Sequence, residues 1–372
     1  MYKIIKLIVP AFFIMLTLVS CKGDGKYLSI GEPHFVNDFP NRGELRQIDD
    51  FHIDEIGLRS VKVVDTLLFI YRSAGPLDES ATWLIYSLDG KKKYEECMKV
   101  GRGPGEFTYI PWANSCHFFH KNDSLFVHMP ERHKGYLYEM NITKHLKEGG
   151  EVPYPVVETG HINSSCWSTT PCGGGRALLN RANDDFTGIQ RLMYENDTVR
   201  PMPITRDIDN ATIAKSDDIS DLNLLTKNIC YNAAADKFVE AMYYFNQINI
   251  YSADGTEGRT ICVGNKLDDL SLIENTPRFV RKNNYGALSA WDEGFGAAYL
   301  GDSEINLQQL LSNKSQIQFF DWEGNPKYLV ELPYQIEEFD IDFTNNVLYV
   351  ISQNNDKVMA YDATDIIRHL KS

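Results

Sequence analysis

Four histidines stand close together and are the first residues to weigh as metal ligands: His117, His120, His128 and His133. A metal site needs its ligands on one face. Side chains three residues apart on a strand point to opposite faces, so His117 and His120 do not form a ligand pair on an extended segment. The chain also contains no C-x-x-C spacing. These histidines and cysteines therefore predict no zinc site, and no metal-ligating residues are identified among them.

Paired carboxylates are the second set with chemical potential, because calcium binding and acid–base catalysis both use them. Such pairs occur at Asp207/Asp209 and at Asp340/Asp342. Neither pair carries the spacing of a helix–loop–helix calcium loop. The chain has no Gly-x-Ser-x-Gly elbow, and spacing alone joins no serine, histidine and aspartate into a triad. We therefore identify no catalytic residues and no cofactor, and calcium stays open as an alternative.

Tryptophan and arginine near predicted strand ends are better candidates, for binding rather than catalysis. Trp112, Trp167, Arg181 and Trp291 lie in or beside predicted connections, and Arg102 lies in a glycine-rich turn. Both residue types are enriched at recognition surfaces. The competing interpretation is that the tryptophans pack between neighbouring sheets. These five residues are the predicted ligand-binding candidates.

Internal repetition indicates which elements must position these residues. A short strand that ends in an aromatic residue, followed by an Asp, Asn or Gly turn, recurs six times. The aromatic anchors are Tyr86, Tyr138, Tyr194, Tyr251, Phe320 and Tyr361, between 41 and 69 residues apart. A turn residue followed by an apolar strand precedes each one, starting at Asp65, Asp123, Gly175, Asp236, Gly294 and Asn346. The two markers agree on six units with roughly the period of four-stranded propeller blades.

These repeats predict an all-β fold, a six-bladed β-propeller over residues 27–372. The 20 Tyr and 19 Phe favour strands. A lone small sheet is marginally stable, so the blades must stack and close into a ring. We expect an N-terminal segment, 45–53 or 27–35, to supply the outer strand of the last blade. An open pair of β-sandwiches is the alternative.

Two acidic segments, 205–226 and 264–284, interrupt the repeat period. They contain Asp217-Asp218 and Asp268-Asp269. Either segment has room for a short helix. We expect both to be loops on one rim of the ring, where propellers place recognition surfaces. The alternative is a solvated spacer.

The first twenty residues are expected to be an export signal. Lys3 and Lys6 precede an uncharged apolar run at 7–19, which is too short to cross a hydrocarbon core of about 30 Å as a helix. Leu18-Val19-Ser20-Cys21 then resembles a bacterial lipobox. The sequence therefore predicts cleavage after residue 20, lipidation of Cys21, a tether at 21–26, and an outer-membrane lipoprotein on the periplasmic or cell-surface side.

Six further cysteines are expected to enter an oxidising compartment, which permits disulfides. Cys166 and Cys172 are closest in sequence and are the predicted pair. The alternative is that all six are small buried apolar residues.

Gly101-Arg102-Gly103-Pro104-Gly105-Glu106-Phe107, with Pro111 shortly after, follows a predicted strand at 94–100. This stretch resembles the G-R-G-P-G-E-F motif of TolB-like six-bladed propeller lipoproteins of Bacteroidetes-type bacteria. The resemblance implies the fold and an envelope location but little chemistry. From the residues alone, the glycines and proline indicate a tight crossing between blades. Glu106 is expected to accept backbone N–H groups there, and Phe107 to fill the seam.

Three tripeptides resemble the D-[ST]-apolar acceptor of envelope O-glycosylation: Asp65-Thr66-Leu67, Asp123-Ser124-Leu125 and Asp197-Thr198-Val199. Thr66, Ser124 and Thr198 are the candidate acceptors. The alternative is ordinary turn chemistry, since Asp, Ser and Thr favour turns.

The net charge of the chain argues against some classes of binding partner. The chain has 37 Lys and Arg against 51 Asp and Glu, a net charge of −14. Duplex affinity depends on neutralising phosphates, so a nucleic-acid partner is not expected. We predict an envelope platform that binds a protein or glycan ligand and meets the membrane through its lipid anchor only. Two alternatives stay open: a hydrolase or lyase with a divalent metal in the central channel, and a structural subunit of an outer-membrane complex.

Overall fold

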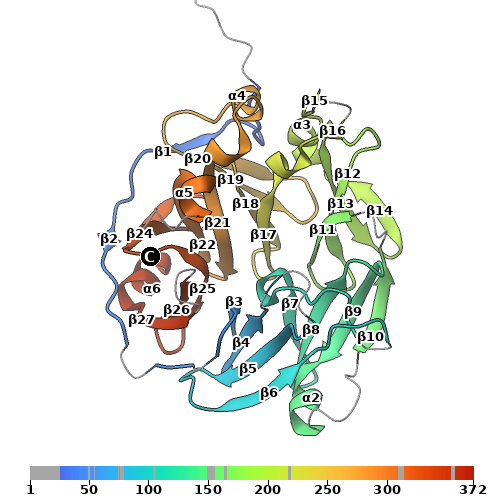
Figure 1. Cartoon of the computed structure of the whole chain (residues 1–372), viewed down its shortest axis with the longest axis vertical. Coiled ribbons are helices and arrows are strands. Elements are labelled where there is room, and N and C mark those ends of the chain that lie inside the picture. The colour runs from blue at the N-terminus through green and yellow to red at the C-terminus, as the bar shows by residue number, and fades with distance from the viewer. Residues whose placement is uncertain are drawn as a thin grey trace, which may run out of the picture.

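Six small antiparallel sheets form a ring in the computed structural model (Figure 1). The structure describes residues 26–372 except 49–50, 54, 74, 76–78, 104–105, 149–155, 163–165, 217–218, 309–313 and 353–356. The predicted signal peptide, Cys21 and most of the tether lie outside the described residues. Within the described part, no helix is long and apolar enough to span a bilayer. The prediction of a six-bladed β-propeller is confirmed.

The six blades follow one another along the chain, each ordered from the centre outward. They are β3 (Leu58–Val64), β4 (Leu67–Arg72), β5 (Thr82–Ser87), β6 (Lys93–Cys97); β7 (His117–Lys121), β8 (Ser124–Glu131), β9 (Tyr136–Asn141), β10 (Val156–His161); β11 (Cys166–Pro171), β12 (Ala177–Ala182), β13 (Ile189–Glu195), β14 (Thr198–Pro201); β17 (Lys227–Asn232), β18 (Lys237–Met242), β19 (Gln247–Ser252), β20 (Gly258–Val263); β21 (Lys282–Trp291), β22 (Gly294–Ser303), β23 (Ser315–Phe320), β24 (Pro326–Leu332); and β25 (Ile336–Asp342), β26 (Val347–Ser352), β27 (Lys357–Asp362). The two sequence markers are the second and third strands of every blade.

Short helices occupy the connections. They are the 3-10 turns Ala113–Ser115, Pro203–Thr205, Leu222–Leu225 and Arg278–Val280, and the α-helices α2 (Ile142–Glu148), α3 (Arg206–Asp209), α4 (Leu270–Glu274), α5 (Glu304–Gln308) and α6 (Thr364–Leu370). A small hairpin, β15 (Lys215–Ser216) and β16 (Ile219–Ser220), lies in the 205–226 connection. Leu224 and Leu270 are fully buried. The two acidic connections are therefore fastened to the core rather than being free spacers.

The tight hairpins explain several of the sequence markers. Asn122 and Asp123 both adopt positive φ between β7 and β8, and so do Asn196 and Asp197 between β13 and β14. Two-residue turns of this handedness match the right-handed twist of the strands. Asn and Asp tolerate this backbone better than other side-chain-bearing residues.

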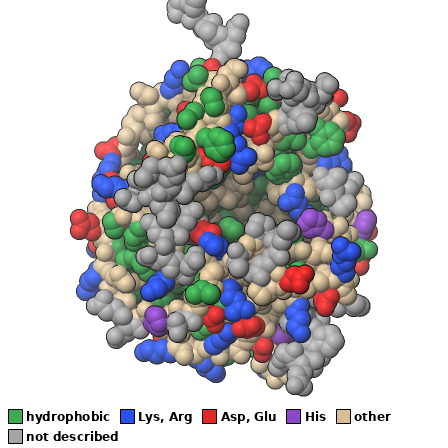
Figure 2. All heavy atoms as spheres, viewed as in Figure 1, with side chains coloured by type: hydrophobic (Ala, Val, Ile, Leu, Met, Phe, Trp, Pro, Cys, Tyr) green, Lys and Arg blue, Asp and Glu red, His purple; other side chains and the backbone are tan. Residues whose placement is uncertain are grey.

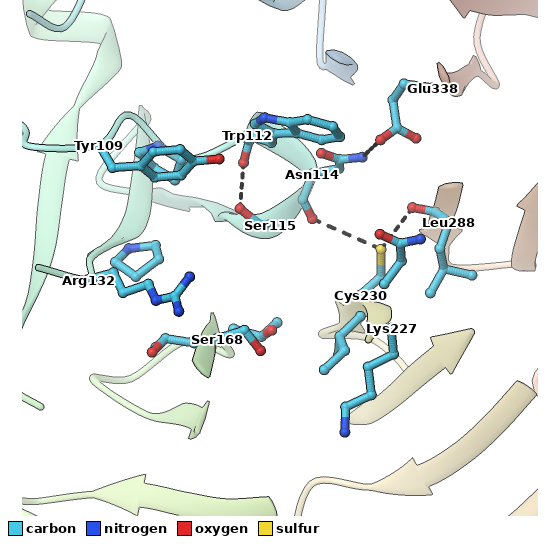
Figure 3. A pocket seen from close by; sticks show the side chains of 16 residues that line it. Tyr109, Trp112, Asn114, Ser115, Arg132, Ser168, Lys227, Cys230, Leu288 and Glu338 are labelled. Atoms are coloured by element: carbon cyan, nitrogen blue, oxygen red, sulfur yellow. Dashed lines mark hydrogen bonds between the residues drawn. The ribbon is translucent and has the colours of Figure 1, made fainter. Parts of the chain in front are cut away.

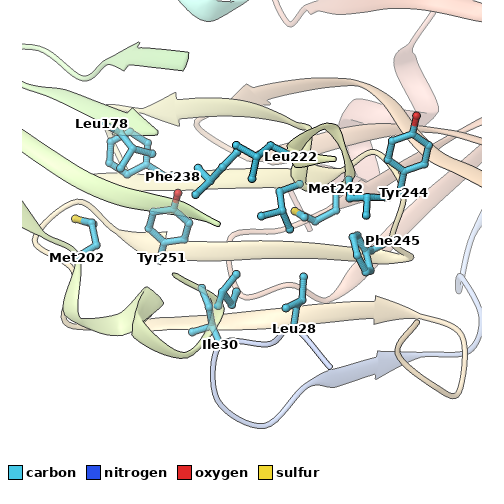
Figure 4. Packing of buried hydrophobic residues seen from close by; sticks show 14 of the residues in the cluster. Leu28, Ile30, Leu178, Met202, Leu222, Phe238, Met242, Tyr244, Phe245 and Tyr251 are labelled. Atoms are coloured by element: carbon cyan, nitrogen blue, oxygen red, sulfur yellow. The ribbon is translucent and has the colours of Figure 1, made fainter. Parts of the chain in front are cut away.

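The apolar core lies in the seams between blades rather than inside any one sheet. Phe69 and Trp83 of the first blade pack in one cluster with Val127 and Met140 of the second. Figure 4 shows the seam between the third and fourth blades, where Leu178 and Phe238 form part of one cluster. Each blade thus buries its faces only against neighbours, which is why the ring must be complete.

An N-terminal strap, residues 26–48, runs outside the last three blades (Figure 1, blue). Its strands β1 (His34–Val36) and β2 (Arg42–Gly43) pair in parallel with β20 and β24. Gln47 then bridges Tyr361 of β27, and the Ile48 N–H donates to the Ala360 carbonyl at 2.8 Å. Segment 27–35 thus lies against the fourth blade, and the start of 45–53 lies against the sixth.

Candidate functional site

Two cavities lie at the two ends of the central channel. The upper cavity, about 220 Å³, is where most inner strands begin, and the lower cavity, about 550 Å³, is where they end. The space-filling view shows the ring hollowed at its centre (Figure 2). Asn114 and Cys230 line both cavities. These two residues therefore mark the constriction between the mouths.

The upper cavity combines aromatic rings with polar groups (Figure 3). Its lining comprises Tyr109, Pro111, Trp112, Asn114, Ser115, Pro130, Arg132, Ser168, Thr169, Thr170, Lys227, Asn228, Ile229, Cys230, Leu288 and Glu338. These residues come from connections or strands of five blades. Such a convergence of few polar groups on an apolar wall is the usual form of a ligand pocket.

The glycine-rich turn after β6 sets the position of the aromatic residues. The Gly103 N–H donates to Glu106 Oε2 at 2.7 Å, as expected for Glu106. A Cβ at Gly101 would overlap that carboxylate, so a side chain there would displace Glu106 from this position. Phe107 is fully buried in the seam between the first two blades, also as expected. Trp83 Nε1 then donates to the Pro111 carbonyl at 2.8 Å, which fixes the chain just before Trp112.

Glu338, the second residue after the start of its inner strand, lines the upper cavity and contacts Asn114 at the constriction. It is 2 % exposed. Asn114 Nδ2 donates to its Oε2, and the neighbouring Phe339 N–H donates to Oε1 at 3.2 Å. Burial disfavours the charged carboxylate and raises the pKa of Glu338 to about 8. Glu338 is therefore largely protonated at neutral pH and can donate as well as accept a hydrogen bond.

Lys227 brings a second shifted group to the upper cavity wall. Its ammonium is buried, and no hydrogen-bond acceptor of the described residues reaches Nζ. Glu240 Oε2 lies 3.8 Å away. Burial, reinforced by the nearby Arg191 charge, lowers the pKa of Lys227 to about 8. The lysine therefore sits near its titration point at neutral to mildly basic pH.

Behind Lys227 lies a buried ion network between the third and fourth blades. Arg191 donates to both oxygens of Glu240, at 2.9 and 2.6 Å, and also pairs with Asp209. Burial alone would raise the pKa of Glu240, but Arg191 and Lys227 lower it to about 2. Asp209, one of the two acidic residues paired at 207 and 209 in the sequence, is thus committed to an arginine.

A saturated carboxylate lies behind the wall of the lower cavity, and its three partners, Lys62, Val63 and Trp291, line that cavity. Asp340 is fully buried and accepts from the Val63 N–H at 2.7 Å and from Trp291 Nε1 at 2.7 Å. Lys62 Nζ adds an ion pair at 3.1 Å. Asp65, Asp292, Glu293 and Asp342 give the surrounding lining an acidic character.

The five predicted binding residues do not share one site. Trp112 lines the upper cavity, and Trp291 lines the lower one. Trp167, Arg181 and Arg102 line neither of these two cavities. Trp167 packs against the apolar cluster between the third and fourth blades, and Arg102 is exposed in its turn.

The predicted Cys166–Cys172 disulfide is wrong. All six described cysteines are free thiols. Cys166 begins β11, and Cys172 directly follows its end. Six residues of extended strand separate their Cα atoms by roughly 20 Å, whereas a disulfide needs less than about 7 Å.

The candidate glycosylation residues all lie at hairpins. Thr66 lies in the turn between β3 and β4, Ser124 begins β8, and Thr198 begins β14. Thr66 and Thr198 are exposed, while Ser124 is half-buried. Thr198 Oγ1 also donates to the Glu195 carbonyl at 2.6 Å, which accounts for this threonine as a turn residue.

No group of three His, Cys, Asp or Glu residues in the described part of the chain is placed to hold a metal ion. His120 instead contacts Asp65 at 2.9 Å on the surface, and His128 faces Glu139 at 3.4 Å. Asp342, of the second acidic pair, accepts the Thr344 N–H at 2.8 Å and so shapes a turn.

Sequence reasoning missed Asn114, Lys227 and Glu338. Each lies at or near the start of an inner strand, without a motif around it. For Lys227 and Glu338 the one available signal was a charged residue within a strand-like segment, which the pattern alone would place toward solvent. Their convergence depends on ring closure between distant blades.

Comparison with known proteins identifies the fold alone. No known family profile matches the chain, and no curated protein matches it in sequence. A Bacteroides vulgatus protein of the DUF4221 family has a TM-score of 0.50 at 11% identity, over 86% of this chain and 97% of that one. An exported protein from Bacteroides fragilis and the calcium-binding protein regucalcin from Agrobacterium tumefaciens each give 0.44. Their identities are 10% and 9%, over 86% and 89% of this chain and 92% and 95% of theirs.

Proposed function

We propose that the protein is an exported, lipid-tethered binding protein whose upper channel mouth takes the end of a glycan. The carrying observation is the upper cavity, where Trp112 and Tyr109 stand beside Arg132, Asn114 and the protonated Glu338. Aromatic faces pack against the apolar faces of sugar rings, and the polar groups can satisfy hydroxyls. The cavity is smaller than the roughly 300–1,000 Å³ of drug-sized sites, so it suits a chain end rather than a whole oligosaccharide.

The proposed location is the outer membrane, on its periplasmic or cell-surface side. Support comes from the apolar leader, the lipobox ending at Cys21, and the resemblance of the glycine-rich turn to TolB-like propeller lipoproteins. Incorporation of labelled palmitate into the wild-type chain, and its loss in Cys21→Ser, tests the tether independently of ligand binding.

A glycan array tests the binding role. We expect the wild-type protein to select a subset of glycans and Trp112→Ala to lose at least tenfold in affinity for them. Trp167→Ala is the matched control because Trp167 lines neither channel cavity, and it should bind as wild type. If selective binding survives Trp112→Ala, the upper cavity is not the binding site. If the wild-type protein binds no glycan, the proposed ligand is wrong.

A second candidate, a hydrolase or lyase working in the channel, is favoured by one observation. Glu338 and Lys227 both have pKa values near 8, and perturbed groups in a cleft are typical of catalytic acids and bases. In that case Glu338 would act as the general acid. Turnover of a bound glycan by wild type but not by Glu338→Gln would establish it.

A further inference from the structure

One corner of the ring carries a concentration of exposed apolar side chains. Twelve large hydrophobic residues are exposed in the described part of the chain, and five of them belong to this corner. They are Tyr27, Leu272, Phe279, Val280 and Ile305, between 39 and 68 % exposed. We call these five residues the anchor patch. Single exposed apolar residues are ordinary, but a contiguous group marks an interaction surface.

Backbone and side-chain contacts join the elements of the anchor patch. The Leu270 N–H at the start of α4 donates to the Lys26 carbonyl at 2.8 Å, and Tyr27 bridges Asp269. The Arg278–Val280 turn is tied to α5, since Arg278 Nε donates to Glu304 Oε2 at 3.2 Å. In Figure 1, α4 lies where the N-terminal trace leaves the ring, with α5 below it.

Local folding leaves these side chains without a partner in the described protein. Leu270 of α4 is fully buried, while Leu272, two residues later on the short helix, is 68 % exposed. Phe279 and Val280 are likewise more than half exposed, in the turn between α4 and β21. Polar residues would serve the fold equally well at these positions, so the apolar choice needs a reason outside the ring.

Exposed lysines flank the anchor patch. Lys26, Lys266 and Lys282 are exposed at this corner. Nearby acidic side chains are held in local contacts: Asp269 accepts the Ser271 N–H at 2.9 Å, Asp268 accepts the Asn246 N–H at 2.8 Å, and Glu304 pairs with Arg278. The three lysines are the groups of this corner that an anionic surface would attract. Anionic lipid headgroups attract such residues.

We propose that the anchor patch is a membrane-contact surface that rests on lipid headgroups beside the Cys21 anchor. The proposal rests on the tether proposed above. Five residues of chain join Cys21 to Lys26, and they span at most about 18 Å, so the anchor holds this corner close to the bilayer. Apolar side chains with flanking lysines supply a second membrane signal, which fixes the orientation of the ring in a way a lipid chain alone cannot.

Flotation with vesicles of phosphatidylglycerol and phosphatidylethanolamine tests the proposal without the acyl chain. The protein used is the chain from residue 21 to 372 carrying Cys21→Ser. We expect it to bind these vesicles, to bind less at high salt, and to lose at least tenfold in partitioning when it also carries Leu272→Asp and Phe279→Asp. The matched control carries Ile56→Asp and Val157→Asp, which are 84 and 60 % exposed on the first two blades, and should partition as the parent.

Three outcomes would overturn the proposal: no vesicle binding by the unacylated parent, equal loss in the control, or no loss in the anchor-patch variant. Light scattering in parallel measures whether the protein forms a dimer through the anchor patch instead. A dimer abolished by Leu272→Asp and Phe279→Asp, without vesicle binding, would assign the patch to a second copy of the chain. Because neither acylation nor glycan binding enters this assay, its failure is distinct from failure of the proposed function.

Discussion

The two mouths of the central channel lie at opposite ends of the inner strands. They differ in how fully their buried charged groups are hydrogen-bonded. At the lower mouth, Asp340 receives two N–H donors and the Lys62 ammonium. At the upper mouth, Lys227 Nζ lacks a hydrogen-bond acceptor among the described residues, and Glu338 titrates far from its usual range. A saturated ion holds strands together, whereas an undersatisfied one costs stability and remains available to a ligand.

The largest expected effect on stability comes from removing the buried Asp340 charge at the lower mouth. Asp340→Asn removes the charge that pairs with Lys62 and places an amide against N–H donors. We expect a loss of about 3–5 kcal/mol in unfolding free energy, the range for breaking a buried pair from one side. Urea unfolding followed by tryptophan fluorescence measures it.

Asp65→Asn is the control for this prediction. Asp65 lines the same mouth, but its side chain is 46% exposed, and asparagine tolerates its positive φ. The change should cost less than about 0.5 kcal/mol. Equal costs at positions 65 and 340 would contradict the contrast between the mouths.

A smaller effect is expected from Glu338→Gln, and it depends on pH. Since burial raises the folded-state pKa of Glu338 to about 8, above its unfolded value of 4.5, the native state retains a proton that the unfolded state releases. Stability from this group is full below pH 4.5 and is lost as pH rises toward 8. Lys227 contributes no slope below its pKa of about 8.

Thermal unfolding at pH 6 and pH 7.5 measures this difference. We expect wild type to lose about 1–2 kcal/mol more than Glu338→Gln over this interval. Glu331→Gln, at an exposed position of β24, should follow wild type. A Glu338→Gln profile parallel to wild type would mean that Glu338 is not buried as described.

The smallest effect concerns the constriction between the mouths. The Cys230 thiol donates to the Leu288 carbonyl at 3.1 Å, and burial raises its pKa to about 12. Iodoacetamide at pH 8 should therefore leave Cys230 unmodified in the native protein and label it after unfolding. Peptide mass spectrometry reads the result. Rapid native labelling would show that the two cavities form one open channel.

The fold was largely predictable from the sequence because each blade carries its own local marks. Turn residues such as Asp123 and Asn346 and third-strand aromatics such as Tyr86 and Tyr251 recur within a few residues of one another. Strand alternation and turn chemistry act over short distances, so six repeats can be counted without the tertiary structure. The role of Glu106 in its turn followed from the same short-range argument.

The sites were decided only by the tertiary structure. Trp112 precedes the inner strand β7 and Trp291 ends the inner strand β21, and ring closure gathers these strand ends into two separate mouths. The Cys166–Cys172 prediction failed for a related reason. Residues that are close in sequence but lie at the two ends of an extended strand are far apart in space. The sequence by itself determined the six blades. Asn114 meets Glu338 across 224 residues only because the blades close into a ring. Burial there, rather than residue type, shifts the pKa of Glu338.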